Sequence, residues 1–446
     1  MIQIYDSLRG EKVSLGKEPG EKIRMYVCGP TVYDHAHLGH GRSAVAFDVV
    51  RRFLEFSGYH VDFCFNITDI EDKMITRAAK EGITVPELAE KIIPEYKADY
   101  AALGVQAPTF NPRATEFVDP MIEIIKKLEG KGHTYELADG IYYDISTFPQ
   151  YGKLSHQKID ELESNVGARM EERSDKRHFQ DFVLWKFKKE GEPFWPSPWG
   201  DGRPGWHIEC SAMSSQLLGE TFDIHGGGLD LKFPHHECEI AQSEGITGKT
   251  FARIWMHNGY ITVNEEKMSK SLNNFFTLKE IFANYHPRVV RFFLLTAHYR
   301  SPIEYSTEML EQARNTLKSL DEFYLSHRAK RSGADNNSEI DEALTKPFYE
   351  KMANDFDVAG ALAVLFEWMK GNPKNIQGSL ERINQVLQIF SIDFELSERQ
   401  KKILVERETA RTAKDWKKSD ETRTLLAEEG IDVEDRPEGP FAKPKI

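Results

Sequence analysis

Residues 25–69 read MYVCGPTVYDHAHLGHGRSAVAFDVVRRFLEFSGYHVDFCFNITD, and this stretch decides the fold. It begins with an apolar run over 25–28 that indicates a short buried strand. Apolar residues then recur with helical spacing over about 43–56, and Gly58 ends this helix. An alternating strand follows over 61–67. Strand, helix and strand in this order predict a parallel βαβ unit, with ligands at the carboxyl ends of its strands.

The rest of the chain, 446 residues in all, is long enough for several domains. We expect an α/β protein: a Rossmann-like parallel-sheet domain with an insertion, then a C-terminal helical bundle and a small tail domain. Helical patterns fill 307–392, and a polar helix is expected over about 397–428. The expected boundaries are 1–115 and 201–300 for the two halves of the sheet domain, 116–200 for the insertion, 301–393 for the bundle and 394–446 for the tail.

Composition and charge limit the class of function. The formal net charge of −13 argues against a general nucleic-acid binder, because phosphate contacts need a basic surface. Residues 401–446 carry 11 Lys/Arg and 11 Asp/Glu, so any RNA surface is expected at that end. No apolar run approaches membrane-spanning length, and the N-terminus does not resemble a secretory signal. Four widely spaced cysteines do not form a disulfide framework, so we expect a cytoplasmic protein.

Two short motifs are typical of a nucleotide site. His37-Leu38-Gly39-His40 lies between a strand end and a helix start, where Gly39 lets a nucleotide approach the backbone and the helix N-terminus favours phosphate. Lys267-Met268-Ser269-Lys270-Ser271 places two lysines where they could stabilise a nucleotidyl group in transfer. Each motif alone also fits an ordinary polar turn. Together they resemble the two signatures of class I aminoacyl-tRNA synthetases.

Four further residues form a candidate metal site: Cys28, Cys210, His235 and Glu239. Pro234 suits the first turn of a helix, which would place His235 and Glu239, four residues apart, on one face. Two thiolates, one imidazole and one carboxylate are a plausible tetrahedral zinc set. The competing interpretation is that the cysteines are small buried core residues, and Cys64, inside a predicted strand, is assigned to that role.

At these residues the chain resembles the cysteinyl-tRNA synthetase family, and the likeness covers essentially its whole length. The runs that carry it are Cys28-Gly29-Pro30-Thr31-Val32-Tyr33-Asp34, the His-Leu-Gly-His motif, Gly205-Trp206-His207-Ile208-Glu209-Cys210-Ser211-Ala212-Met213 and His225-Gly226-Gly227-Gly228-Leu229-Asp230-Leu231. The resemblance implies that L-cysteine is activated by ATP to cysteinyl-adenylate, with release of pyrophosphate, and passed to the terminal adenosine of tRNA(Cys). It also implies a catalytic role for the sheet domain and tRNA binding by the bundle and tail.

The resemblance further implies one Zn²⁺ per chain, Mg²⁺ with ATP, and roles for individual residues. Zinc would recognise the substrate thiol, because a thiolate is a far better ligand than the hydroxyl of serine. The implied catalytic residues are His37, His40, Lys267 and Lys270. The implied ATP-binding residues are His37, Gly39, His40, Asp230 and Lys270. The candidate substrate contacts are Thr31, Thr68, Trp206 and His225; a threonine could meet either the ammonium or the carboxylate group, and a buried core role explains Trp206 equally well.

Some features depart from the family pattern. Leu38 replaces the commoner Ile, and Cys238 stands where the family often has Asn, three residues from His235, so it could compete with Glu239 for the metal.

Residues 411–423 combine basic side chains with Trp416 and would meet the anticodon end, although a solvated helix with a packed Trp explains them equally well.

Two other functions fit part of the pattern. The first is the related ligase that joins cysteine to an amino sugar in mycothiol synthesis, which would share the zinc and ATP sites. The long region after the second motif, with its bundle and tail, favours tRNA charging instead. The second is a non-catalytic, zinc-stabilised RNA-binding protein, which the intact histidine and lysine motifs disfavour. We expect a monomer.

Overall fold

The structure is a computed structural model that describes residues 1–157, 175–268, 274–329, 339–371, 373–437 and 439–446. These residues form two compact units. The first comprises Met1–Glu280, Ala297–Glu304 and Met352–Asp357, and the second comprises Ile281–Thr296, Tyr305–Lys351 and Val358–Ile446. Within the described residues, no helix combines the length and the apolar composition that crossing a membrane requires.

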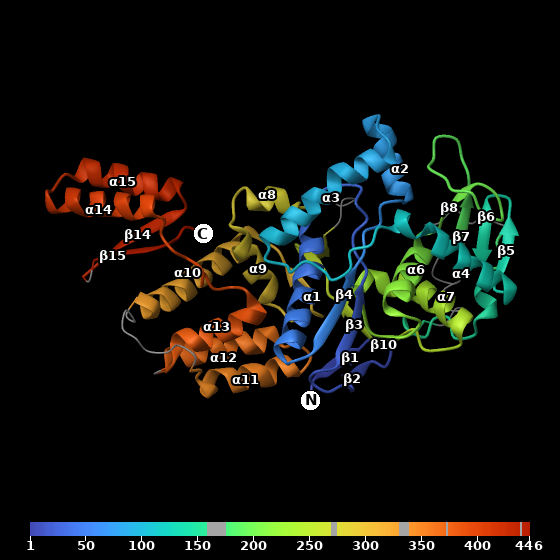
Figure 1. The fold of residues 1–446 in the computed structure, drawn as a ribbon, viewed down its shortest axis with the longest axis horizontal. Coiled ribbons are helices and arrows are strands. Elements are labelled where there is room, and N and C mark those ends of the chain that lie inside the picture. The colour runs from blue at the N-terminus through green and yellow to red at the C-terminus, as the bar shows by residue number, and fades with distance from the viewer. Residues whose placement is uncertain (158–174, 269–273, 330–338, 372, 438) are drawn as a thin grey trace. The chain divides into compact units, whose positions relative to one another are not determined.

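A four-stranded parallel sheet lies at the centre of the first unit (Figure 1). Strand β3 (Lys22–Val27) pairs with β4 (His60–Phe65) on one side and with β9 (Phe222–Gly228) on the other, and β10 (Ala252–Asn258) pairs with β9. Helix α1 (Leu38–Phe56) joins β3 to β4. The predicted parallel βαβ unit is therefore confirmed, and the carboxyl ends of its strands share one edge of the sheet.

Helix α1 begins five residues earlier than the apolar pattern predicted. Its first turn is the His-Leu-Gly-His motif, and His37 is the N-cap. The backbone N–H of His40 donates to Nδ1 of His37, and the backbone N–H of His37 donates to Nδ1 of His40, both at 3.3 Å. This reciprocal cap satisfies two backbone donors that a helix otherwise leaves without partners. A prediction from apolar periodicity missed this turn because its capping residues are polar.

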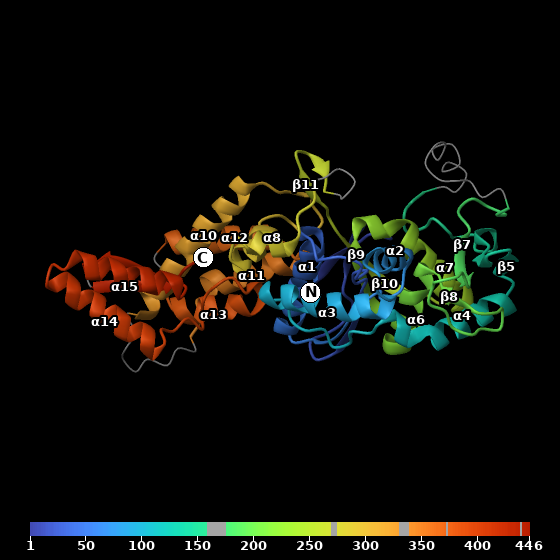
Figure 2. The same cartoon turned by 90° about the horizontal axis from the view of Figure 1, so that it is seen from above.

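The predicted insertion contains an antiparallel sheet of four strands, which are β5 (Thr134–Leu137), β6 (Gly140–Tyr143), β7 (Phe182–Phe187) and β8 (Gly202–Pro204). Helices α6 (Trp206–Leu218) and α7 (Glu237–Thr247) lie between this sheet and the parallel sheet in both views (Figures 1 and 2). One hydrophobic core joins them, with Tyr26, Tyr143 and Trp255 among its members. The insertion therefore holds α6 and α7 by shared packing. Its boundaries at 116 and 200 stay a prediction.

Shorter elements complete the first unit. They are β1 (Gln3–Asp6), β2 (Glu11–Ser14), α2 (Asp72–Glu81), α3 (Val85–Ala102), α4 (Val118–Gly130), β11 (Ile261–Val263), β12 (Glu266–Lys267) and β13 (Ile303–Glu304). Helix α8 (Leu278–Phe282) begins in this unit and ends in the second. Strand β12 carries the first lysine of the second motif.

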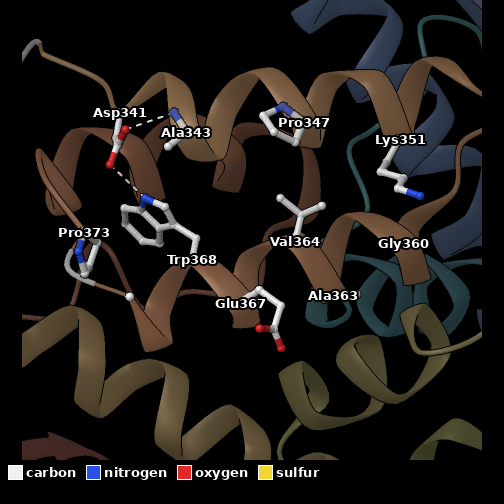
Figure 3. A pocket seen from close by; sticks show the side chains of 11 residues that line it. Asp341, Ala343, Pro347, Lys351, Gly360, Ala363, Val364, Glu367, Trp368 and Pro373 are labelled. Atoms are coloured by element: carbon white, nitrogen blue, oxygen red, sulfur yellow. Dashed lines mark hydrogen bonds between the residues drawn. The ribbon is translucent and has the colours of Figure 1, made fainter.

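The second unit is helical, as predicted for 307–392. Its helices are α9 (Pro287–Leu295), α10 (Thr307–Ala329), α11 (Glu342–Ala353, of which the last two residues belong to the first unit), α12 (Val358–Lys370) and α13 (Ile376–Leu387). A cavity of about 630 Å³ lies beside α11 and α12 (Figure 3). At one end of it, the indole N–H of Trp368 donates to Asp341 at 2.9 Å. None of the predicted site residues lines this cavity.

The single polar helix predicted for 397–428 is wrong. Two helices form there, α14 (Glu398–Thr412) and α15 (Trp416–Glu428). Lys414 adopts a left-handed conformation with φ 59°, and the Asp415 side chain accepts a hydrogen bond from the Lys418 backbone, which starts the second helix. The tail after them folds as a hairpin of β14 (Ile431–Arg436) and β15 (Gly439–Pro444), and a small core of Ile403, Leu426, Ile431 and Val433 joins it to the helices.

A substitution at Gly29 tests how closely the ends of β3 and β4 approach each other. A Cβ at this position would lie 1.6 Å from the carbonyl oxygen of Asn66, so Gly29→Ala must push the two strand ends apart. We expect this variant to lose about 3 kcal/mol of unfolding free energy. Gly130→Ala is the control, because a Cβ there meets nothing within 4 Å. Thermal unfolding of both variants measures the effect, and equal midpoints would contradict the close approach.

Candidate functional site

Two thiols, an imidazole and a carboxylate converge at the carboxyl edge of the parallel sheet. Cys28 directly follows β3, Cys210 lies in α6, and Glu239 lies in α7. His235 belongs to a wide helical turn, η4 (Lys232–His236), that precedes α7. The ligand atoms of the four residues lie within 4.8 Å of one another. Regular helix begins only at Glu237, later than Pro234 indicated, yet His235 and Glu239 still meet.

The spacing of these atoms fits a tetrahedral metal ion. The sulfurs of Cys28 and Cys210 are 3.6 Å apart, and Sγ of Cys28 is 3.5 Å from Oε1 of Glu239. Nε2 of His235 is 3.1 Å from the same carboxylate oxygen. Around a tetrahedral zinc ion these separations would be about 3.8, 3.6 and 3.4 Å, because zinc–sulfur bonds are about 2.3 Å and zinc–nitrogen and zinc–oxygen bonds about 2.1 Å. The four residues, which we call the metal cluster, therefore fit such an ion.

All four residues of the metal cluster are buried, and burial together with Cys210 and Glu239 raises the pKa of the Cys28 thiol well above its usual range. Burial by itself would raise the pKa of Cys210, but the hydrogen bond from Cys28 and the charge on His235 lower that pKa to about 6. Burial likewise opposes ionisation of His235 and Glu239. The neighbouring Cys210 and Glu239 nevertheless raise the pKa of His235 to about 10. In the same way, His225 and His235 lower the pKa of Glu239 to about 2. A divalent cation could replace the proton on His235 and balance the thiolate and carboxylate.

Further side chains orient the metal cluster. His225, fully buried, has its Nε2 2.8 Å from Oε2 of Glu239. Nδ1 of His207 is 2.9 Å from Nδ1 of His235, and the Trp206 ring stacks on His235 with centroids 4.3 Å apart. Such partners fix the ring orientation of a metal-ligating histidine. The two predicted substrate residues Trp206 and His225 thus both contact residues of the metal cluster.

The remaining cysteines lie outside the metal cluster. Sγ of Cys238 is 3.4 Å from the hydroxyl of Tyr151, and Cys64 is buried within β4. A second group of ligand atoms is equally compact and consists of Cys28, His225, His236 and Glu239. Among the described residues, Cys238 joins neither group. The geometry therefore favours Glu239 over its rival in the sequence.

The described part of the second motif, Lys267 and Met268, and the segment after residue 273 lie close to the first motif in the first unit. The backbone N–H of Leu38 donates to the carbonyl of Phe276 at 3.1 Å, and that of Leu278 donates to the carbonyl of Ala36 at 2.8 Å. A Cβ on Gly39 would lie 3.7 Å from Cε of Met268. Met268 of the second motif and residues 276–278, which follow it, thus lie beside the first motif. Ser269, Lys270 and Ser271 lie outside the described residues.

The imidazoles of His37 and His40 stack, with centroids 3.6 Å apart. Because Nδ1 of each ring accepts a backbone N–H, each neutral ring carries its proton on Nε2. The hydroxyl of Tyr96 also lies 3.3 Å from Nδ1 of His40. A Cβ on Gly39 would come within 2.9 Å of the His37 ring, so the glycine is needed for this stacking. The N–H group of each neutral ring in the motif is therefore at Nε2.

Lys267, the first residue of the second motif, contacts Asp230. Nζ of Lys267 is 3.4 Å from Oδ2 of Asp230 and 4.1 Å from the ring centre of Tyr260. Both charged side chains are about half exposed, so their ion pair contributes little stability and can be exchanged for another partner. A lysine and a carboxylate predicted to meet ATP thus lie close together.

Thr31 and Thr68 face each other where the ends of β3 and β4 meet. The hydroxyl of Thr68 donates to Oε2 of Glu209 at 3.0 Å and lies 3.4 Å from Nδ2 of Asn66. Burial raises the pKa of Glu209 well above its usual range. Neither Glu209 nor Asn66 was singled out from the sequence. One sequence signal pointed to Glu209, namely its position directly before the predicted metal ligand Cys210. An acidic residue is usually exposed, so one beside a buried ligand is unusual.

Comparisons with known proteins agree on one family. The family model for the tRNA synthetases class I (C) catalytic domain matches residues 16–315, and the model for the cysteinyl-tRNA ligase anticodon binding domain matches residues 393–440. The cysteine–tRNA ligase of Lachnoclostridium phytofermentans is 45% identical and aligns over 98% of this chain and 99% of its own. The enzyme of the same name from Geobacter sulfurreducens is 43% identical over the full length of both.

Solved structures share the fold at low sequence identity. Methionyl-tRNA synthetase of Mycobacterium tuberculosis in complex with methionyl-adenylate superposes with a TM-score of 0.60 at 16% identity and covers 82% of this chain and 92% of that one. The ternary complex of Agrobacterium radiobacter LeuRS with tRNA and LeuAMS gives a TM-score of 0.62 at 11% identity and covers 84% of this chain and 85% of that one. These likenesses bear on the fold alone.

Metal analysis tests the ligand set. We expect the purified chain to bind one divalent ion, and Cys210→Ala to lose it because a thiolate ligand is removed. Cys238→Ala is the matched control, since that cysteine lies in α7 but outside the metal cluster. Elemental analysis after dialysis measures the bound ion. A Cys238→Ala variant that lost the ion, or a Cys210→Ala variant that kept it, would show that the assignment is wrong.

Proposed function

Because the chain belongs to the cysteine–tRNA ligase family of class I aminoacyl-tRNA synthetases, it is an enzyme that charges tRNA, and we propose that it does so in two steps. In the first, the carboxylate of L-cysteine attacks the α-phosphate of ATP, forms cysteinyl-adenylate and releases pyrophosphate. In the second, the cysteinyl group passes to a hydroxyl of the terminal adenosine of tRNA(Cys), and AMP leaves. The convergence of the metal cluster at the carboxyl edge of the catalytic sheet supports the choice of cysteine.

We propose that the ion of the metal cluster is Zn²⁺. Two thiols with one imidazole and one carboxylate suit zinc better than magnesium or calcium, which prefer oxygen ligands. Bound zinc would supply a Lewis acid that prefers the thiolate of cysteine to the hydroxyl of serine. The protein residues hold the four donors at fixed spacing, while His207 and His225 orient His235 and Glu239.

The ATP-binding residues are proposed from the two motifs. The Nε2–H groups of His37 and His40 would donate to phosphate oxygens at the N-terminus of α1, where the helix dipole also favours negative charge. Lys267, and by resemblance Lys270, would stabilise the charge that builds on the phosphates. Asp230 would bind the ATP ribose after giving up its contact with Lys267. Mg²⁺ would accompany the triphosphate and neutralise part of its charge.

The tRNA is proposed to meet the second unit. Trp416 is 57% exposed, and the guanidinium of Arg411 lies 5.9 Å from its ring centre. The Trp is thus not packed in a core, and an exposed aromatic ring beside basic side chains suits an unstacked RNA base. An anticodon-binding region favours a tRNA acceptor over an amino sugar.

The four cysteines are free, which supports a reducing compartment such as the cytoplasm. The monomeric state stays a prediction.

The activation step can be measured without tRNA. We expect cysteine-dependent exchange of pyrophosphate into ATP, and a fall of about 10²–10³ in its rate for His40→Ala, because one donor to the phosphates is lost. His60→Ala is the control, since His60 is exposed at the start of β4. Absence of any exchange with the unmodified chain would favour the non-catalytic alternative. A His40→Ala variant with an unchanged rate would remove this residue from the mechanism.

The choice between cysteine and serine tests the role of the metal. Cys210→Ser weakens the metal cluster, so we expect the KM for cysteine to rise by about 100-fold and the preference over serine to shrink. Exchange assays with each amino acid give both values, and Cys238→Ser again serves as control. A variant that lacks the ion but binds cysteine as tightly and rejects serine as well would show that the metal does not select the substrate.

A further inference from the structure

A buried carboxyl group beside the metal cluster has no structural partner for one of its oxygens. Glu209 is 1% exposed in the first turn of α6, next to Cys210. Its Oε2 accepts the hydroxyl hydrogen of Thr68 at 3.0 Å. Its Oε1 is buried and has no hydrogen-bond partner among the described residues. Burying such a group costs stability, so a role beyond holding the fold together is expected of it.

The contact with Glu209 fixes the direction in which Thr68 can form hydrogen bonds. A hydroxyl group has one hydrogen and two lone pairs. Thr68 gives its hydrogen to Glu209 and lies 3.4 Å from the side-chain N–H group of Asn66, which occupies one lone pair. The position left for a ligand is the second lone pair. With Oε2 of Glu209 as the acceptor, Thr68 has no hydrogen left to donate to a ligand and can only accept a further hydrogen bond.

Neighbouring contacts hold Asn66 and Thr68 in place. Oδ1 of Asn66 accepts the backbone N–H of Gly29 at 2.8 Å, which fixes which end of the amide faces Thr68. The backbone N–H of Thr68 donates to Pro30 at 3.0 Å, and its carbonyl accepts from Val32 at 3.2 Å. The Thr68 backbone is thus anchored to Pro30 and Val32, and its hydroxyl group to Glu209 in the helix that carries Cys210.

These contacts distinguish between the two charged groups of cysteine. An ammonium group only donates hydrogen bonds, and a carboxylate only accepts them. An oxygen that can only accept matches the ammonium group and does not match the carboxylate. The structure thereby selects one of the two alternatives that the sequence leaves open for Thr68.

We infer that Glu209 is a positioning residue for substrate cysteine: it takes the hydrogen of the Thr68 hydroxyl and so turns the Thr68 oxygen toward the α-ammonium group as an acceptor. This inference rests on the proposed function, since it requires that cysteine is the substrate of this site. Glu209 acts through Thr68 and does not itself touch cysteine. Its contribution is to the binding of the amino acid, not to that of ATP or the metal.

Two thiols that each lack one end of cysteine test the inference. Cysteamine keeps the ammonium group, and 3-mercaptopropionate keeps the carboxylate. Both are measured as competitive inhibitors of cysteine-dependent pyrophosphate exchange, with the unmodified chain and with Glu209→Ala. We expect Glu209→Ala to raise the KM for cysteine and the inhibition constant of cysteamine by about 10- to 100-fold, because a hydrogen bond to a charged group is weakened. The inhibition constant of 3-mercaptopropionate, the KM for ATP and the bound metal should not change.

Matched variants separate positioning from damage to the fold. Glu209→Gln should restore the KM for cysteine, because an amide oxygen also accepts the Thr68 hydrogen. Thr68→Val should resemble Glu209→Ala, and the double variant should be no worse than either, because both changes remove the same interaction. If Glu209→Ala does not fold, the two inhibitors are compared on Thr68→Val and Glu209→Gln.

Three results would overturn the inference. They are loss of metal from Glu209→Ala, equal weakening of cysteamine and 3-mercaptopropionate, and multiplied effects in the double variant. The first would show that Glu209 supports Cys210, the second that Glu209 does not act on the ammonium group in particular, and the third that Thr68 and Glu209 act separately. Failure of the proposed function has a different signature, which is the absence of cysteine-dependent exchange with the unmodified chain.

Discussion

The ends of β3 and β4 lie so close together that only a glycine fits at the contact, and the rest of the site depends on this approach. A Cβ on Gly29 would lie 1.6 Å from the Asn66 carbonyl oxygen, while the backbone N–H of Gly29 donates to Oδ1 of Asn66 at 2.8 Å. The strands are parallel, so both ends face the same edge of the sheet. Cys28 on one strand end and Thr68 on the other are thereby held within one small polar region.

Two helices complete that region from the other side. Helix α6 brings Cys210 and Glu209, and α7 brings Glu239, while the core shared with the antiparallel sheet keeps both helices against the parallel sheet. Thiols, imidazole and carboxylate buried and packed this tightly favour a bound cation, because isolated buried charges are costly. The insertion thus serves the site through packing, although it supplies no residue to the metal cluster.

Substrate selection and phosphate chemistry fall on different parts of the same sheet edge. In the proposed assignment, the metal cluster binds the thiol, which sets cysteine apart from serine, and the Asn66–Thr68–Glu209 contacts bind the ammonium group. The stacked rings of His37 and His40 begin α1 and present their donors separately from these groups. This division lets the selective interactions be rigid and buried, while Lys267, half exposed, can change partners when ATP binds.

The amino-acid sequence by itself determined the βαβ unit, the helical second unit, both nucleotide motifs and the residue types that suit zinc. These depend on local periodicity and on the chemistry of individual side chains, which a sequence displays directly. Tertiary structure decided the early start of α1, the break at Lys414, the preference for Glu239 over Cys238, and the pairing of Thr68 with Glu209, which is 141 positions away. Local pattern cannot predict such features, because they depend on which distant side chains the packing of sheet, helices and insertion brings together.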